Sequence, residues 1–201
     1  MISKIFLATI SIFFITTAVI SEQVAGQTYT ISNASTMTIY GSSNVTDWEA
    51  EVKTINGTIV IRNTENADWS EADASWFQRV EISIPVSDID ADSRRMNNNM
   101  HNYLKAGSHP NITYRMLEAT ELIALDNPGS VLVARGRINA AGANHEIEHE
   151  VEINKNEEGK LTISGSHDLL MTDFGIDPPT AMLGSIRSHD KVTIEFNLIL
   201  E

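Results

Sequence analysis

Apolar and polar residues alternate with a period of two along most of the chain after residue 27. Successive side chains of a β-strand point to opposite faces, so this alternation is typical of strands with one buried face. The two clearest runs are residues 80–86 and 192–200. Further strands are expected at residues 29–32, 36–40, 48–53, 57–62, 112–116, 131–135, 146–153 and 160–165.

Two segments depart from the alternation. Within residues 92–106, apolar side chains recur at the spacing of one helical face, where they are Met96, Met100, Tyr103 and Leu104. Three consecutive asparagines at 97–99 are unfavourable inside a helix, so a short or irregular helix is expected. Residues 174–188 contain the pair Pro178-Pro179 and predict a long, ordered connection before the last strand.

These elements predict an all-β fold. About eight or more antiparallel strands with one short helix, and no alternation of strands with long helices, indicate a barrel or a sandwich. The last strand is long, and a closed barrel would pair it on both sides and leave no exposed sheet edge. We therefore expect an antiparallel β-barrel of about eight strands with a short helical insertion. No repeat or composition shift divides residues 27–201, which form one predicted domain.

The N-terminus has the layout of a secretory signal peptide. Lys4 gives a short positive region, residues 5–20 are mostly apolar, and small residues at Ala25 and Gly26 offer a cleavage site. We expect residues 1–26 to be removed and the protein to be exported, to the periplasm or outside the cell. A retained anchor is the alternative, but the apolar stretch is shorter than the ~20 residues that span a bilayer. No stable membrane anchor is therefore expected.

Charge and composition narrow the classes of partner. The chain has 27 acidic and 14 basic residues and a formal net charge of -13, so nucleic acid and anionic membrane surfaces would be repelled. It has no cysteine, which excludes disulfides, thiolate metal sites and cysteine nucleophiles. A hydrophobic content of 42% agrees with a folded protein.

The segment His145-Glu146-Ile147-Glu148-His149 fits the H-E-x-x-H pattern of zinc proteases. That pattern binds zinc on a helix, where the two histidines lie one turn apart. Here the segment alternates as a strand, and residues four apart on a strand are separated by roughly 13 Å. One zinc ion could not bind both side chains, and the glutamates would form a solvated face. A metal-dependent hydrolase that uses His145 and His149 remains the alternative function.

The other four histidines form no local cluster with carboxylates, and they are expected on the surface or in loops: His101, His109, His167 and His189. The sequence also has no Gly-x-Ser-x-Gly nucleophile motif and no phosphate-binding glycine-rich loop. We therefore expect a protein that is not an enzyme and has no metal.

Several segments, taken in order, resemble the YceI-like family of exported polyisoprenoid-binding proteins. They include GSSNVTDW at 41–48, VEISIPV at 80–86, HPNITY at 109–114 and MTDFGI at 171–176. Weaker matches cover 29–31, 96–105, 133–143 and 184–187, so the resemblance extends over nearly all of residues 27–201. It implies a lipocalin-like barrel with an elongated apolar cavity. It also implies binding of an isoprenoid or quinone-like lipid, without chemistry on that lipid.

Apolar side chains outside the regular strands are the candidate ligand-binding residues. They are Trp48, in the early glycine- and serine-rich motif, and Met96, Met100, Leu104, Met171, Phe174, Met182 and Leu183. Methionine is flexible and suits a pocket that accepts a bending chain. The same residues could instead plug the barrel ends as ordinary core.

The predicted function is therefore binding, and carriage or storage, of an amphiphilic lipid in the cell envelope. A ligand-free β-domain that contacts other envelope proteins is a further alternative. No cofactor other than a bound isoprenoid or quinone-like lipid is expected.

Overall fold

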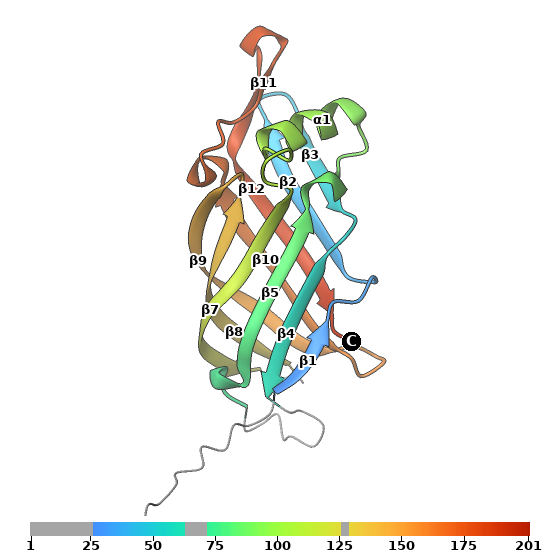
Figure 1. Ribbon diagram of the computed structural model, residues 1–201, viewed down its shortest axis with the longest axis vertical. Helices are drawn as coiled ribbons and strands as arrows, with labels where there is room; N and C mark the ends of the chain where they lie inside the picture. Colours follow the sequence, from blue (N-terminus) through green and yellow to red (C-terminus); the bar gives the residue numbers. More distant parts are fainter. Residues whose placement is uncertain (1–25, 63–71, 126–128) are drawn as a thin grey trace, which may run out of the picture.

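The protein forms one curled antiparallel sheet capped by a short helix (Figure 1). The computed structural model describes residues 26–62, 72–125 and 129–201. Residues 1–25, which hold nearly all of the predicted signal peptide, lie outside the described residues. The expected all-β architecture with one helical insertion is confirmed.

The long strands are β2 (Thr36–Ser43), β3 (Asp47–Val52), β4 (Asn56–Arg62), β5 (Phe77–Pro85), β7 (Asn111–Ala124), β8 (Gly129–Ala140), β9 (Ala143–Lys155), β10 (Leu161–Leu170) and β12 (Ile186–Ile199). Shorter strands are β1 (Gly26–Thr30), β6 (Ile89–Asp90) and β11 (Thr180–Ala181). The helix is α1 (Arg94–Tyr103), and the 3₁₀ turns are η2 (Ala74–Trp76), η3 (Val86–Asp88), η4 (Met171–Phe174) and η5 (Met182–Gly184).

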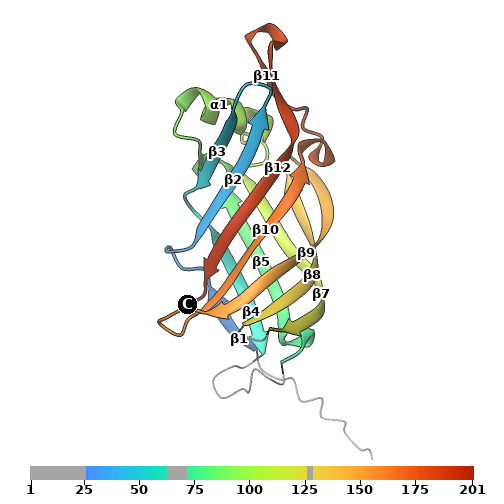
Figure 2. The ribbon, with the colours of Figure 1, turned by 180° about the vertical axis from the view of Figure 1, so that it is seen from behind.

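The sheet closes into a barrel, and different strands complete the ring at its two ends. The strand order is β1-β4-β5-β7-β8-β9-β10-β12-β2-β3-β6, and β11 pairs with β12. At one end a bridge between Ile31 and Leu200 joins β1 to β12 and completes a ring. At the other end β3 pairs with β6, which continues β5 after the turn η3. Figure 2 shows β2 and β3 at the upper end and β1 and β4 at the lower end.

The structure has twelve strands, but it agrees with the expected barrel of about eight because different strands surround its two ends. The lower ring consists of β1, β4, β5, β7, β8, β9, β10 and β12. In the upper ring β2 and β3 replace β1 and β4, and β5 is extended by β6. Each level is thus surrounded by eight strands, a number just wide enough to pack the barrel's own side chains or to hold one ligand.

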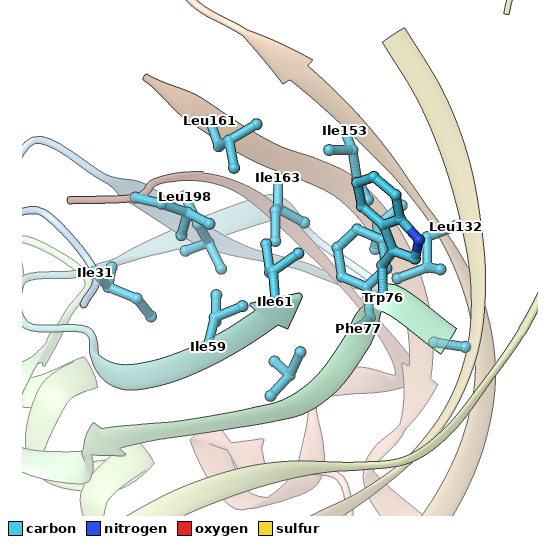
Figure 3. Packing of buried hydrophobic residues seen from close by; sticks show 14 residues of the cluster. Ile31, Ile59, Ile61, Trp76, Phe77, Leu132, Ile153, Leu161, Ile163 and Leu198 are labelled. Carbon is cyan, nitrogen blue, oxygen red and sulfur yellow. The ribbon is translucent and has the colours of Figure 1, made fainter. Parts of the chain in front are cut away.

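Large apolar side chains fill the lower end of the barrel. Ile59 and Ile61 are fully buried there, and Trp76 and Phe77 from η2 and β5 close the end (Figure 3). Burying each such side chain contributes about 1.5–3 kcal/mol relative to its exposure to water. This cluster therefore stabilises the barrel at its lower end.

Helix α1 lies across the opposite, upper end of the barrel (Figure 1). The Ser93 side chain caps its N-terminus by accepting a hydrogen bond from the Met96 amide. The Asn97 side chain donates to Asp90 Oδ1 and accepts from the Ala91 amide, both at 2.8 Å. The first asparagine of the run therefore ties the helix to the segment that follows β6. The short helix expected from residues 92–106 is confirmed over ten residues.

The segment expected as a connection, 174–188, is partly strand. It contains β11 and the start of β12, which form a hairpin around η5. The β12–β2 register shifts between Ser188 and Val192, which is the mark of a bulge. The bulge interrupts the alternation, so the sequence pattern places the start of the last strand too late.

One close contact between β2 and β3 gives a test of the fold. Gly41 pairs with Trp48, and a Cβ on Gly41 would lie 2.1 Å from Trp48 Cζ2. The indole ring therefore occupies the place of a side chain. Gly41→Ala should lower the free energy of unfolding by about 1–3 kcal/mol, as measured by urea denaturation. Gly107→Ala is the control, because nothing lies within 4 Å of the added carbon. Equal losses in both variants would contradict this packing.

Candidate ligand-binding cavity

The barrel holds two adjoining chambers, one at its upper end and one further inside. The outer chamber, beneath α1 and the β11–β12 hairpin, has a volume of about 340 Å³, and the inner chamber has about 120 Å³. Both are bordered by the same four residues, Ile112, Ile138, Leu169 and Ile194. These residues therefore lie at the boundary between the two chambers, which follow one another inside the barrel, and the inner chamber is bordered by residues of the packed lower core.

Six of the eight predicted ligand-binding residues line the outer chamber: Trp48, Met96, Met100, Leu104, Met171 and Phe174. They come from β3, from α1 and its C-terminal cap, and from the turn η4. The side chain of Phe174 is 5% exposed and packs beside Leu169 and Ile176. The structure thus brings together residues that are more than 100 positions apart in the sequence.

The remaining two predicted residues, Met182 and Leu183, do not lie in the cavity wall. They form the tip of the β11–β12 hairpin, which projects beyond the barrel rim (Figure 1). Both have positive φ angles, 50° and 56°, because the turn at the tip requires left-handed backbone. Their side chains are 66% and 108% exposed, so this part of the expectation is corrected.

A cluster of three polar side chains lies in the inner chamber, and we call it the inner polar cluster: Tyr114 on β7, His149 on β9 and His167 on β10. The Tyr114 hydroxyl and His149 Nε2 are hydrogen-bonded at 2.8 Å, with their rings edge to face. The rings of His149 and His167 also meet edge to face, with centroids 5.9 Å apart. Continuing the β9–β10 register past its last pair places these two histidines opposite each other.

Gly136 on β8 makes this cluster sterically feasible. A Cβ at Gly136 would lie 2.2 Å from Tyr114 Cε2 and 2.4 Å from the Tyr114 hydroxyl. The tyrosine ring therefore crosses the bare backbone of β8 to reach β9. Any larger residue on β8 would push the hydroxyl away from His149.

Burial keeps the inner polar cluster uncharged near neutral pH. Desolvation, together with a smaller repulsion from His167, lowers the pKa of His149 to about 4. Desolvation also lowers the pKa of His167, against an opposing attraction from Asp168. The pKa of Tyr114 is raised to about 12, again by desolvation. All three groups are therefore neutral hydrogen-bonding groups at pH 7.

Sequence reasoning missed this cluster. His167 was expected on the surface or in a loop, but it lies half-buried inside β10 and faces the cavity. The signal that could have found it is the inward alternation of Ile163, Gly165, His167 and Leu169. Tyr114 was expected only as a strand residue.

The H-E-x-x-H segment lies on β9, as expected from its alternation. Glu146 faces outward and pairs with Arg137 at 2.6 Å. His145 lies against Phe174, with ring centroids 5.7 Å apart, and its Nε2 is 3.6 Å from Asp173 Oδ2. In the described part of the chain, no group of three or more histidine or acidic side chains could hold a metal ion. The alternative of a metal-dependent hydrolase therefore lacks, among the described residues, the helical metal site that it requires.

Comparison with models of known protein families shows to which family the chain belongs. A sequence model of the YceI-like domain matches residues 29–200. The chain belongs to the YceI-like family. This assignment agrees with the barrel, the cap helix and the order of motifs along the chain.

Solved structures share the YceI-like barrel. The crystal structure of BcnA from Burkholderia cenocepacia is 15% identical, with a TM-score of 0.63, covering 84% of this chain and 98% of that one. A polyisoprenoid binding domain from Saccharophagus degradans is 12% identical, with a TM-score of 0.63 and coverages of 86% and 97%. The YceI protein of Campylobacter jejuni is 16% identical, with a TM-score of 0.52 and coverages of 100% and 99%. The expected lipocalin-like barrel is confirmed.

The comparison with curated protein sequences gives no match. Within residues 26–62, 72–125 and 129–201, the helices are too short or too polar to cross a lipid bilayer.

The lowered pKa of His149 predicts a loss of stability in acid. The unfolded chain takes up a proton on this histidine below pH 6.5, whereas the folded protein does so only near pH 4. This contribution to stability is therefore complete above pH 6.5 and is lost as the pH falls toward 4. Between pH 7 and pH 5, the wild type should lose about 2 kcal/mol through this group. Urea unfolding at the two pH values measures the loss.

The control for this prediction is His149→Leu. Removing the imidazole leaves the Tyr114 hydroxyl without that partner, so the variant can be less stable at both pH values. The prediction concerns only the difference between pH 7 and pH 5, which should shrink by about 2 kcal/mol in the variant. An unchanged difference would show that His149 titrates normally in the folded protein.

Proposed function

We propose that this protein binds an isoprenoid or a similar amphiphilic lipid without catalysing a reaction on it, and that it carries or stores that lipid in the cell envelope. The observation that carries the proposal is the pair of adjoining chambers inside the barrel, whose walls are almost entirely aliphatic, aromatic and methionine side chains. Ligand pockets in proteins generally have volumes of about 300–1,000 Å³, and the outer chamber alone lies within that range. A cavity of this shape suits a long, flexible, apolar chain.

The composition of the walls supports binding over catalysis. Among the described residues that line the two chambers there is no aspartate, glutamate, lysine or arginine. Acid–base catalysis on a lipid needs a positioned proton donor and acceptor with a pKa near the working pH. The pKa of His149, lowered to about 4, and that of Tyr114, raised to about 12, lie far from neutrality.

Relatives support the same ligand class. The Saccharophagus degradans protein is described as a polyisoprenoid binding domain, and it shares the barrel with this chain. At 12% identity that likeness concerns the fold. The local support is that six apolar residues of this chain, chosen from its sequence, line the outer chamber.

We place the protein outside the cytoplasm, with residues 1–26 as a cleaved signal peptide and residues 27–201 as the barrel domain. Support comes from the positive, apolar and small-residue regions of the N-terminus. N-terminal sequencing of the protein from the expressing cell's envelope fraction or medium should start near Gln27. An intact Met1 on that protein would instead indicate a retained anchor.

Phe174 provides the test of lipid binding. A Phe→Ala change in a filled core costs about 3–5 kcal/mol, whereas a residue that faces a ligand contributes less to the stability of the protein alone. Phe174→Ala should therefore reduce the co-purified lipid markedly, with a stability loss below that range. Lipid mass spectrometry and urea unfolding on wild type and variant measure the two effects.

The control is Ile123→Ala on β7, an exposed position outside the cavity that should leave the lipid content unchanged. A full core-sized loss of stability with unchanged lipid would make Phe174 a plug. Wild-type protein without any lipid, and unable to take up added lipid, would favour a ligand-free domain.

A further inference from the structure

The β11–β12 hairpin ends in two large apolar side chains that the described residues leave uncovered. Met182 is 66% exposed and Leu183 is 108% exposed, and the hairpin projects beyond the barrel rim (Figure 1). Neither side chain lines the two chambers. A single exposed apolar residue is ordinary, whereas adjacent ones at a projecting end indicate a contact surface. We call residues 182–184 the hairpin tip.

The backbone of the hairpin tip makes its apolar residues more unusual. Met182, Leu183 and Gly184 follow one another with φ angles of 50°, 56° and 86°. This left-handed conformation favours glycine, asparagine and aspartate, which would form the turn with less strain and would also be better solvated. Methionine and leucine are therefore unfavourable here for the turn and for its exposure to water, and the fold alone does not explain them.

Several polar groups of the tip are already hydrogen-bonded. The Met182 carbonyl accepts from the Ser185 amide at 3.2 Å, and the Gly184 carbonyl accepts from Arg187 Nε at 3.0 Å. The Ser185 carbonyl accepts from Asn44 Nδ2 at 2.9 Å. A backbone carbonyl without a partner opposes transfer into an apolar layer, and these three carbonyls have partners within the protein.

The hairpin is attached to the neighbouring turn between β2 and β3. Besides its bond to Ser185, the Asn44 side chain accepts a hydrogen bond from the Arg187 amide at 2.8 Å. The next residue on that turn, Val45, is a third apolar side chain with 66% exposure. These bonds hold the hairpin tip in a fixed position relative to the barrel.

The mouth of the outer chamber lies at the same end of the barrel. Exposed residues among those that line this chamber include Thr46 on the β2–β3 turn, Tyr103 on α1 and Thr180 on β11. The two strands of the hairpin also contribute Ala181 and Ile186 to the chamber wall. A surface that contacts the hairpin tip would therefore lie next to the mouth.

The size and charge of the hairpin tip fit a neutral bilayer better than another protein. A stable protein interface buries about 800 Å² on each partner and involves about 20–30 residues a side, whereas this tip offers two side chains, with Val45 nearby. A bilayer needs no matching shape, only apolar side chains that reach below the headgroups. Residues 178–188 have no acidic residue and one basic residue, Arg187, although the whole chain has a net charge of -13. That net charge disfavours an anionic bilayer, and the tip itself adds no repulsion from a zwitterionic one.

We propose that the hairpin tip docks the protein reversibly on the surface of a neutral, zwitterionic phospholipid bilayer. Met182 and Leu183 enter the boundary between headgroups and acyl chains, and the mouth of the outer chamber lies beside that surface. Two side chains give a weak, transient attachment, which agrees with a protein that has no stable anchor. The docking goes beyond the proposed lipid-binding function and does not require that the chambers hold a ligand.

Vesicle binding tests the docking. The protein is purified after export, so that the wild type and all variants share one determined N-terminus, and it is sedimented with sucrose-loaded phosphatidylcholine vesicles. The test variant combines Met182→Asn with Leu183→Asn, because asparagine tolerates left-handed backbone and the turn should persist. Its partition coefficient into the vesicles should fall at least about tenfold, since two apolar side chains no longer leave water.

The matched control removes two exposed apolar side chains from the other end of the barrel. Ile123 and Leu125 are each 43% exposed, at and just after the end of β7. The double variant Ile123→Thr with Leu125→Thr should bind vesicles as the wild type does. An equal loss in this variant would show general hydrophobic adsorption and would overturn the docking.

A fluorescent label locates the contact. The chain has no cysteine, so Ser185→Cys next to the tip can carry a single environment-sensitive dye. Its emission should shift to the blue when phosphatidylcholine vesicles are added, whereas the same dye on Ile123→Cys should not respond. Vesicle binding without a shift at position 185 would place the contact elsewhere, and the inference would be wrong.

The remaining outcomes separate the docking from the proposed function. Co-purified lipid is measured in parallel, and the tip variant should keep it, because Met182 and Leu183 lie outside both chamber walls. A wild type that retains lipid but does not bind vesicles would contradict the docking alone. Self-association that depends on the tip, without vesicle binding, would assign the tip to a second copy of the chain and also overturn the inference. Tip-dependent vesicle binding by a protein that holds no lipid would support the docking and remove the proposed function.

Discussion

The structure depends on one constraint: an eight-stranded ring encloses slightly more space than its own inward side chains fill. Eight strands give an interior that holds either a packed core or one small ligand. At the lower end large residues such as Ile59, Trp76 and Phe77 fill it. In the upper half several inward positions are glycine or alanine, among them Gly41, Gly136 and Ala140, and the interior stays open. The stable core therefore lies at the lower end of the barrel, and the chambers lie between that core and α1.

Aromatic rings cover two of these glycines. Gly41 accepts the indole of Trp48 on its bare backbone, and Gly136 accepts the ring of Tyr114 in the same way. Each aromatic side chain is thus laid along the barrel wall, so that it borders the cavity without blocking it. The Tyr114 hydroxyl consequently reaches β9, two strands away, where it meets His149. The Tyr114 hydroxyl can therefore lie midway along the apolar barrel because β8, the strand between β7 and β9, has no side chain at Gly136.

The strands, the single helix and most of the outer chamber could be predicted from the sequence, because each leaves a local signal. Period-two alternation identifies a strand, and apolar residues such as Met96 and Phe174 that lie outside the strands need a buried place elsewhere. The features that the sequence did not predict depend on how segments far apart in the chain are arranged in space. Met182 and Leu183 are apolar too, but a hairpin that projects past the rim exposes them, and no local pattern reports that projection. His167 joins His149 only through the register between β9 and β10.

The H-E-x-x-H segment shows how backbone conformation decides what a set of residues can do. On a helix, His145 and His149 would share one face and one metal ion. On β9 they also share one face, but the pleat separates them along the barrel, and each meets different neighbours. His145 lies beside Phe174 at the outer chamber, while His149 lies beside Tyr114 and His167 in the inner one. The intervening Ile147 is buried between them, and the glutamates face water. The two histidines of the zinc-protease pattern therefore have separate places: His149 lines the inner chamber, and His145 packs against Phe174, which lines the outer one.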